Sequence, residues 1–253
     1  MTPFTANTLA RLGVVPVGVG QALGGQSRLD AALNGVPVLP LSHPNGPNIE
    51  QLAALSPDLV LSTTTWQRGE QAMRGLGMRV VDSDPRSVAQ ASAEIRRIGR
   101  LTGRESKADA LARQVDADVA KARAGISRHP TVMVVLGVGR TPYVALANSW
   151  AGDVVRRAGG RLLTGGLKAS GGMARISNEA VVERDPDVIV AIPHGSPSDL
   201  PRIAAYLRDN PAWRSTRAAR AGRIHVAADD HLLEPWPDVG DVIREVRRKY
   251  LHD

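Results

Sequence analysis

The chain carries the segment NIEQLAALSPDLVLS at residues 48–62, and the segment SNEAVVERDPDVIVA repeats its pattern at residues 177–191. Each copy predicts a short amphipathic helix, a Pro-Asp turn and a buried parallel strand, because proline ends a helix and the apolar run can be covered on both faces. Glu50 aligns with Glu179, and the Pro-Asp pairs align with one another. Two copies of one α/β pattern predict two similar lobes.

Apolar runs of strand length alternate with helical segments along the whole chain, which is typical of an α/β fold with mostly parallel sheets. Strands are expected at residues 14–19, 59–62, 79–81, 132–136, 188–192 and 223–226. Residues 104–124 contain no glycine or proline and carry an apolar stripe, so they predict one long helix. We expect residues 1–103 to form an N-terminal lobe, residues 104–126 a rigid connecting helix and residues 127–253 a C-terminal lobe, with a ligand cleft between the lobes.

The composition argues against several classes of function. The 253 residues include no cysteine, which removes disulfides, thiolate metal sites and cysteine nucleophiles. The 32 Lys and Arg exceed the 25 Asp and Glu to give a net charge of +7, but the basic residues are scattered and only 3% of residues are aromatic, so we expect no nucleic-acid binding. No motif supplies a nucleophile with its base, so we expect that the chain is not an enzyme and has no catalytic residue.

Ligands of parallel α/β sheets gather at the carboxyl ends of strands. The two repeated strands lead into loops in which Thr65 aligns with His194, and a turn-rich loop with His43 precedes the first copy. His43 and His194 are therefore candidate metal ligands, although a lone histidine in such a loop is more often a surface or capping residue. His231, beside two aspartates, is a further candidate for a zinc or manganese site.

Four groups of residues, read together, resemble the ABC-transporter substrate-binding proteins for iron-siderophores, cobalamin and haem. They are Pro47-Asn48-Ile49-Glu50, Ile176-Ser177 with the strand of the second copy, Pro211-Ala212-Trp213, and Ala221-Gly222-Arg223-Ile224-His225-Val226. The resemblance covers essentially the whole chain. Within this family, Pro193-His194-Gly195 and the segment 149–160 look most like the haem-receptor lipoproteins of iron-regulated surface determinant systems.

The resemblance implies a haem site with two axial ligands. In those receptors the histidine of the Pro-His-Gly loop binds the iron, which implies that role for His194. The second ligand is a methionine at the position of Asn45, so His43 is the expected substitute, because imidazole binds iron well and an amide poorly; Met173 is a more distant candidate. The expected ligand contacts, with the arginines directed at the haem propionates, are Phe4, Thr5, Arg28, Thr65, Trp66, Arg140, Tyr143, Trp150 and Arg175.

The resemblance also implies partners and a location. We expect a monomer that delivers haem to an ABC permease and its ATPase, with Glu70 and Asp199, at equal offsets after the repeated loops, as docking contacts. A protein of this family is extracytoplasmic, either periplasmic or lipid-anchored, and the first residues here lack a signal segment. In the family a strand precedes the loop that matches residues 3–6, so we expect a truncated gene model. A ferric-siderophore or cobalamin receptor is the alternative, and a zinc or manganese receptor is a weaker one.

Overall fold

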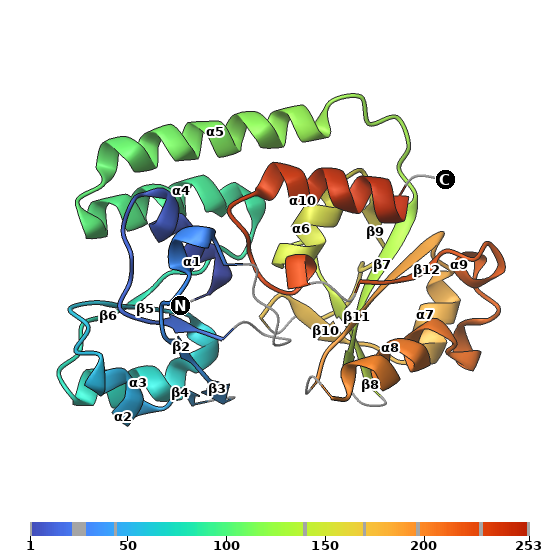
Figure 1. Ribbon diagram of the computed structural model, residues 1–253. Helices are drawn as coiled ribbons and strands as arrows, with labels where there is room; N and C mark the ends of the chain where they lie inside the picture. Colours follow the sequence, from blue (N-terminus) through green and yellow to red (C-terminus); the bar gives the residue numbers. More distant parts are fainter. Residues whose placement is uncertain are drawn as a thin grey trace. The chain divides into compact units, whose positions relative to one another are not determined.

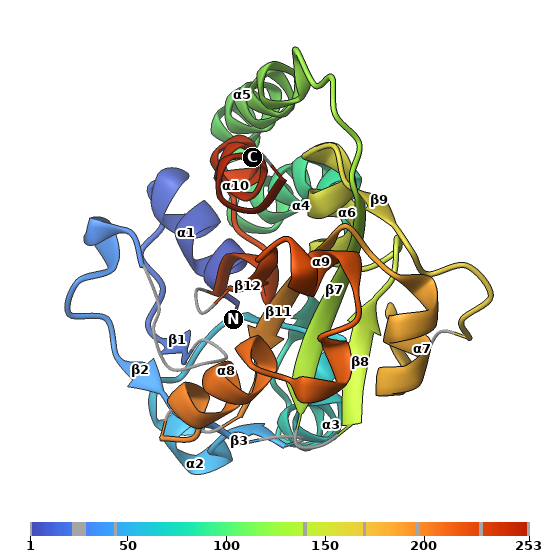
Figure 2. The ribbon, with the colours of Figure 1, turned by 90° about the vertical axis from the view of Figure 1, so that its right-hand side faces the viewer.

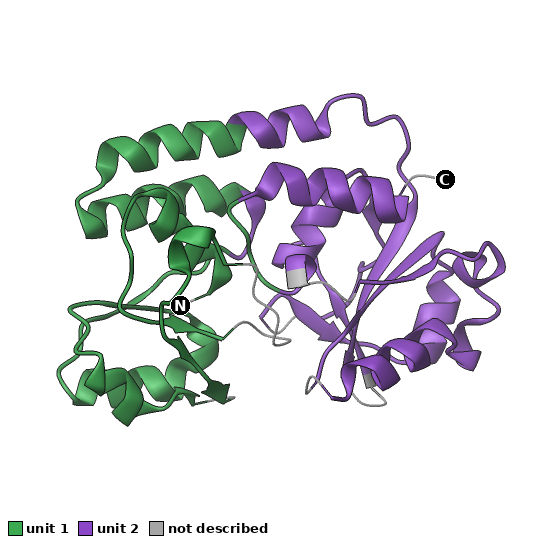
Figure 3. Ribbon diagram, in the orientation of Figure 1, with its two compact units in different colours: residues 1–85, 89–116, 234–237 green, residues 86–88, 117–233, 238–253 purple. Residues whose placement is uncertain are grey.

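The computed structural model (Figure 1) describes residues 2–21, 29–42, 45–138, 141–168, 171–195, 198–227 and 230–251. The chain forms two compact units (Figure 3). Unit 1 contains residues 1–85, 89–116 and 234–237, and unit 2 contains residues 86–88, 117–233 and 238–253. The long helix α5 (Glu105–Arg123) contributes residues to both units. Among the described residues, no helix has the length and apolar character needed to cross a membrane.

Unit 1 consists of short strands and the helices beside them. Besides the start of α5, its elements in chain order are α1 (Pro3–Arg11), β1 (Val19–Gly20), β2 (Val38–Leu39), β3 (Leu41–Ser42), β4 (Gly46–Pro47), α2 (Ile49–Ala54), β5 (Val60–Ser62), α3 (Gln67–Gly75), β6 (Val80–Asp82) and α4 (Val88–Thr102). The described strands form two parallel pairs, β1 with β2 and β5 with β6, and one antiparallel pair, β3 with β4.

Helix α1 begins at the carboxyl edge of the β5–β6 pair. Thr2 is its N-cap, and the Thr2 Oγ1 accepts a hydrogen bond from the Thr5 backbone N–H at 3.3 Å. The Thr5 hydroxyl donates to the carbonyl oxygen of Ser83, directly after β6, at 2.9 Å. Residues 3–9 are buried, so this helix is part of the core of unit 1.

Unit 2 is built on one larger sheet. Its elements are β7 (Thr131–Val138), β8 (Thr141–Ala145), α6 (Trp150–Arg157), β9 (Arg161–Leu162), β10 (Met173–Arg175), α7 (Asn178–Arg184), β11 (Val188–Pro193), α8 (Leu200–Arg208), α9 (Arg217–Arg220), β12 (Ile224–Val226) and α10 (Val239–Val246). The strand order is β10–β8–β7–β11–β12, and β9 pairs with the amino end of β7. Figures 1 and 2 show α6 and α10 on one face of the sheet and α7, α8 and α9 on the other, so the central strands are covered on both sides.

The sequence repeat is confirmed by local geometry. Asn48 and Ser177 cap α2 and α7 by accepting hydrogen bonds from the backbone N–H three residues further on. Each helix is followed by a left-handed residue before proline, Ser56 with φ 46° and Asp185 with φ 42°, and these are the non-glycine residues with positive φ in the described chain. The strands that follow are also equivalent, because Val60 of β5 pairs with Val80 as Ile189 of β11 pairs with Ile224.

The predicted fold class is confirmed, since helices alternate with mostly parallel strands. The helix expected at residues 104–124 is α5, residues 105–123. The strand expected at residues 14–19 is wrong for most of its length, because only Val19 and Gly20 pair with a neighbour. Val15 and Val17 are 63% and 54% exposed, and among the described residues neither pairs with a strand.

Candidate functional site

The carboxyl edge of the sheet in unit 2 gathers several predicted ligand residues. Across four neighbouring strands, Ile192 pairs with Leu136, Leu136 with Tyr143, and Tyr143 with Arg175. Residues that pair directly across strands point to the same face of a sheet. The Tyr143 and Arg175 side chains therefore stand side by side at this edge, and both are exposed.

His194 follows β11 at the same edge. The chain leaves the sheet here, and the last ladder contact is the His194 N–H, which donates to the Gly137 carbonyl oxygen at 3.1 Å. The imidazole is half-buried and belongs to the loop that leads to α8. A strand fixes the position of the residue just beyond its end, so the backbone at His194 is held by the centre of the sheet.

Two glycines, Gly195 in this loop and Gly137 in β7, allow a close approach of helix α8 that the sequence analysis did not predict. A Cβ at Gly195 would lie 2.9 Å from Cδ1 of Ile203, and a Cβ at Gly137 would lie 2.7 Å from Cδ1 of Leu207. Helix α8 packs closely against the loop that carries His194, and a larger residue at either position would push them apart. A glycine that follows a run of apolar strand residues, as Gly137 does, is the signal that could have identified this close approach.

Met173 lies at the start of β10, where it pairs with Ala145, and is half-buried. It therefore lies on the same antiparallel strand pair as Tyr143 and Arg175, two residues before Arg175 in β10. Three of the predicted contacts in unit 2 thus come from β8 and β10, next to the strand that leads to His194.

At the corresponding edge of unit 1, the predicted residues that the structure describes are Asn45, Thr65 and Trp66. Thr65 and Asn45 are exposed, on the turn after β5 and on the turn between β3 and β4. Trp66 is buried at 5% exposure, and its Cβ lies 3.2 Å from the position that a Cβ of Gly46 would take. Trp66 therefore packs against the turn that carries Asn45.

Three other predicted ligand contacts are buried as well. Phe4 and Thr5 are fully buried in α1, where the Thr5 hydroxyl bonds to Ser83. Trp150 of α6 is buried, and its indole N–H donates to the His231 carbonyl oxygen at 2.9 Å. In this conformation these side chains have core positions.

Several predicted residues lie outside the described part of the chain, namely His43, Arg28 and Arg140. His231 is described, and its Nδ1 lies 3.1 Å from Oε2 of Glu245. Within the described ranges, no three histidine or acidic side chains lie close enough together to hold a metal ion.

The two predicted docking carboxylates have different surroundings. Asp199, before α8, is 47% exposed at its side chain and forms an ion pair with Arg202 at 3.2 Å. The Glu70 side chain is only 7% exposed and lies 3.2 Å from the Arg74 guanidinium. A docking contact has to be exposed. The Asp199 carboxylate meets this requirement, and the Glu70 carboxylate does not.

Replacing Glu70 by glutamine is expected to stabilise the protein at neutral pH. Burial raises the pKa of Glu70, and nearby Asp82 raises it further, while Ser62 and Arg74 oppose the shift. An acid whose pKa is raised on folding loses stability as the pH rises through the folded pKa, because the unfolded chain ionises more readily. The gain for E70Q in thermal midpoint should therefore be small near about pH 5 and larger near about pH 8.

Glu179 provides the contrast for this measurement. Hydrogen bonds from its own backbone N–H and from the Ser177 side chain lower the pKa of Glu179. Its carboxylate stabilises the folded state above the unfolded pKa, so E179Q should lower the thermal midpoint or leave it unchanged. A midpoint for E70Q that falls along with that of E179Q would contradict the assigned cost of the buried charge.

The comparisons with known proteins begin with a family model described as "Periplasmic binding protein", which matches residues 1–230. The high-affinity heme uptake system protein IsdE of Staphylococcus aureus is 26% identical over 191 residues, which are 73% of this chain and 64% of that protein. The chain thus matches less than two thirds of the length of this curated relative.

Solved structures show the same fold. An ABC transporter substrate-binding protein from Listeria monocytogenes has a TM-score of 0.81 at 22% identity, over 98% of this chain and 96% of that one. S. aureus IsdE complexed with heme has a TM-score of 0.79 at 23% identity, over 98% and 95%. The triscatecholate siderophore binding protein FeuA of Bacillus subtilis, complexed with ferri-bacillibactin, has a TM-score of 0.75 at 18% identity, over 97% and 89%.

Proposed function

The chain belongs to the periplasmic binding protein family, and on that premise we propose that it binds haem as the receptor of an ABC importer. The observation that carries the proposal is the place of His194. It stands directly after the central strand β11, on a loop whose backbone is tied to β7. Neutral imidazole is a good ligand for haem iron, and a ligand held by a sheet loses little freedom on binding.

The residues near His194 also suit haem as the ligand. Tyr143 offers an exposed aromatic ring, and Arg175 offers a guanidinium at the same edge of the sheet. An aromatic ring can pack against a porphyrin plane, and a guanidinium can bind a propionate carboxylate through two hydrogen bonds. The second axial position falls to His43, with Asn45 and Met173 as the other candidates.

The relatives favour haem without excluding an iron chelate. IsdE, the curated relative, is named a heme uptake protein, whereas FeuA binds a ferric siderophore. Arg175 and the net charge of +7 also suit an anionic ferric chelate. A ferric-siderophore receptor is therefore the second candidate; in that case His194 need not touch the iron.

As a receptor of this kind the protein acts outside the cytoplasm and passes its ligand to a permease, which an ATPase drives. The exposed carboxylate of Asp199 is the proposed docking contact on unit 2. An Asp199→Lys variant that keeps its ligand affinity but no longer supports transport would agree with this role, and one that loses ligand affinity would oppose it.

The function is tested by titrating the protein with hemin and following the Soret absorbance. A saturable one-to-one shift identifies a haem receptor. No shift, together with quenching of tryptophan fluorescence by a ferric triscatecholate, identifies the siderophore receptor instead. A third titration, with free Zn²⁺ and Mn²⁺, tests for a receptor of divalent metal ions.

Replacing Arg175 by alanine is expected to weaken hemin binding by up to about fivefold, the range of one partly exposed ion pair. The loss should shrink as salt is added, because salt screens an exposed charge pair. Arg161 gives the matched control, since it is also exposed but pairs with Thr131 at the opposite, amino end of β7. Equal losses for R175A and R161A would indicate a general charge effect and remove Arg175 from the site.

A further inference from the structure

The net charge of the protein belongs to unit 2. This unit contains 21 Lys and Arg and 14 Asp and Glu, whereas unit 1 contains 11 of each kind. Basic residues that are scattered along the sequence are therefore concentrated in one compact unit. An excess of seven positive charges in this unit favours association with anionic partners.

Most of these basic residues gather at the amino edge of the sheet in unit 2. Helices that pack on a parallel sheet run back toward its amino edge, so their last turns lie there. Helices α5 to α10 all carry Lys or Arg in the last turn. We call this region the cationic end of unit 2, and it comprises residues 118–130, 153–161, 183–187, 208–223 and 241–249.

Contacts between these segments show that they lie together. They join the Arg161 N–H to the Pro130 carbonyl oxygen at 2.9 Å, the Arg247 guanidinium to the Ala124 carbonyl oxygen at 3.0 Å, and the Arg217 guanidinium to the Asp187 carboxylate at 2.7 Å. Asp187 also accepts a hydrogen bond from the Thr131 N–H, directly after the first segment, at 2.8 Å. Five separate segments of the chain thus meet at one end of the unit.

The cationic end carries more charge than its helices require. It contains 16 Lys and Arg and 8 Asp and Glu, an excess of eight, while the rest of unit 2 contains 5 and 6. The carboxyl end of a helix attracts cations with an effective charge of about −0.5, so six helices offset about three positive charges. The acidic partners of the ion pairs are already included in the excess. About five positive charges therefore remain for a partner.

A polar cavity lies in the cationic end. Its volume is about 380 Å³, and its lining includes Arg208, Asp209 and Arg214. Within the described part of the chain, these three side chains make no hydrogen bond or ion pair. Guanidinium groups bind phosphate through paired hydrogen bonds, and a carboxylate beside them can accept hydrogen bonds from hydroxyl groups. The cavity therefore suits a unit that carries both phosphate and hydroxyl groups.

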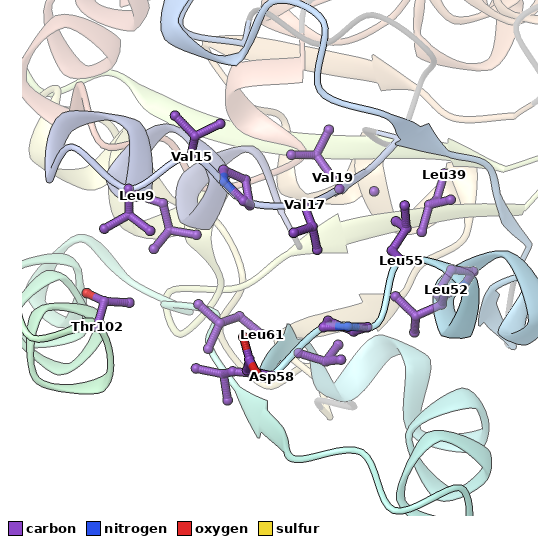
Figure 4. A pocket seen from close by; sticks show the side chains of 18 of the residues that line it. Leu9, Val15, Val17, Val19, Leu39, Leu52, Leu55, Asp58, Leu61 and Thr102 are labelled. Carbon is purple, nitrogen blue, oxygen red and sulfur yellow. The ribbon is translucent and has the colours of Figure 1, made fainter.

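The cavity of unit 1 has the opposite chemistry. It has a volume of about 330 Å³ and is lined mostly by aliphatic side chains, among them Val15, Val17 and Leu61 (Figure 4). Asp58 is the charged residue of its lining. A phosphate there would lose its water without gaining a cation, so we assign anion binding to unit 2.

The surface of the cationic end selects among anionic partners. The large apolar side chains that are exposed in the described part of the chain all lie outside its segments. A stable protein interface has apolar or aromatic side chains at its centre, and single-stranded nucleic acid is held by stacking on aromatic ones. Of the 16 basic residues here, 14 are arginine, which binds phosphate through a rigid set of donors. A hydrophilic polymer of phosphates therefore fits this surface best.

We propose that the cationic end of unit 2 binds a linear, hydrophilic phosphodiester polymer and that Arg208 and Arg214 hold one of its phosphates in the polar cavity. The neighbouring arginines contact further phosphates along the polymer. The choice of a polymer over a lipid surface rests on the proposed function. Asp199, the proposed docking contact, and Arg208 stand at opposite ends of α8, about 13 Å apart along the helix. The cationic end then faces away from the membrane of the permease, where a polymer can bind without competing with docking.

The test follows binding of the whole chain to fluorescently labelled poly(glycerol phosphate) by fluorescence anisotropy at several salt concentrations. Each phosphate contact releases counterions, as it does on single-stranded nucleic acid. Arg208→Gln combined with Arg214→Gln should weaken binding about tenfold and reduce the slope of log affinity against log salt concentration by about 1 to 1.5. The matched control, Arg100→Gln combined with Arg104→Gln, removes two exposed arginines of unit 1 and should change the affinity by less than about twofold.

Three results would overturn the proposal. Equal losses for the two double variants would indicate a response to net charge alone. Tighter binding to phosphatidylglycerol vesicles than to the polymer would assign the surface to a membrane. Tighter binding to single-stranded DNA with the same number of charges would assign it to nucleic acid.

Hemin titration of the same variants separates this inference from the haem receptor. The variant of Arg208 and Arg214 should keep the hemin affinity, the Soret shift and the thermal midpoint of the original chain, because both side chains are exposed at the amino edge. A chain that binds hemin but not the polymer refutes this inference alone. A chain that binds the polymer but not hemin refutes the haem receptor alone.

Discussion

Hemin affinity is expected to fall by about 10- to 100-fold or more when His194 is replaced by alanine. Loss of a group that merely orients a metal ligand costs roughly that much, and a direct ligand contributes more. The Soret band should shift at the same time, because the set of axial ligands changes. The protein should keep its fold, since the imidazole belongs to a loop and the ladder contact of residue 194 is made by its backbone.

His129 offers a matched control for this substitution. It is exposed and precedes β7 at the amino end of the sheet, whereas His194 follows β11 at the carboxyl end. His129→Ala should leave hemin affinity and the Soret band unchanged. If His194→Ala also leaves the Soret band in place, His194 is not an iron ligand, and another residue must hold the iron. A combined His194→Ala and His43→Ala variant then tests the second axial position.

The second large effect is expected from Asp187→Ala, which should destabilise the protein by about 1.5–3 kcal/mol, the range for a hydrogen bond to a charged group. Its carboxylate accepts the Thr131 N–H and hydroxyl and pairs with Arg217 at 2.7 Å. Thr131 is buried, so removal of the carboxylate leaves its N–H and hydroxyl without the oxygen to which they donate. Thermal unfolding followed by circular dichroism measures the loss.

The effect of Asp187 should depend on pH. Burial opposes ionisation, but the hydrogen bonds from Thr131 and the charges of Arg217 and Arg223 outweigh it, so the pKa of Asp187 is lowered. A group with a lowered folded pKa stabilises the protein above its unfolded pKa, about 3.9, and this contribution is lost as the pH falls through the folded value. The wild type and Asp187→Ala should thus converge in acid. A constant difference down to about pH 2 would contradict this origin.

Asp58 is the control for Asp187, because it occupies the same place in the first sequence repeat. Asp58→Ala should change the stability of this chain by less than about 0.5 kcal/mol, the usual range for a surface substitution away from special contacts. A large loss at Asp58 would mean that the two repeats hold their strands in some other way.

The parts of the fold that could be predicted from the sequence are those with strong local signals. The repeated Pro-Asp turns and the apolar runs after them correctly predicted β5 and β11, because proline and a doubly covered strand leave clear patterns. The stripe and the absence of glycine and proline correctly predicted α5. In contrast, the apolar run at residues 14–19 predicted a full strand, but strand pairing depends on a neighbour, which a local pattern does not reveal.

The candidate site was predictable in its position along the chain but less so in its exposure. The loop with His194 lies where the repeat places it, at the end of β11. Trp66, Trp150 and Phe4 were expected to contact ligand, yet each is buried. Residue type alone does not distinguish an aromatic that lines a pocket from one that packs beneath a turn. Glu70 is a similar case, because only the packed structure shows that its carboxylate is covered.

The division of the chain into units bears on how the protein can be synthesised. Residues 234–237, including the buried Trp236, belong to unit 1 but come after the whole sheet of unit 2. Domains that are contiguous in sequence can fold one after another as they leave the ribosome. Here the first unit stays incomplete until the second has been translated, and closing it requires contacts of very large sequence separation, which form slowly. The emerging first half of the protein is therefore exposed to proteases and aggregation for the time needed to translate the second half.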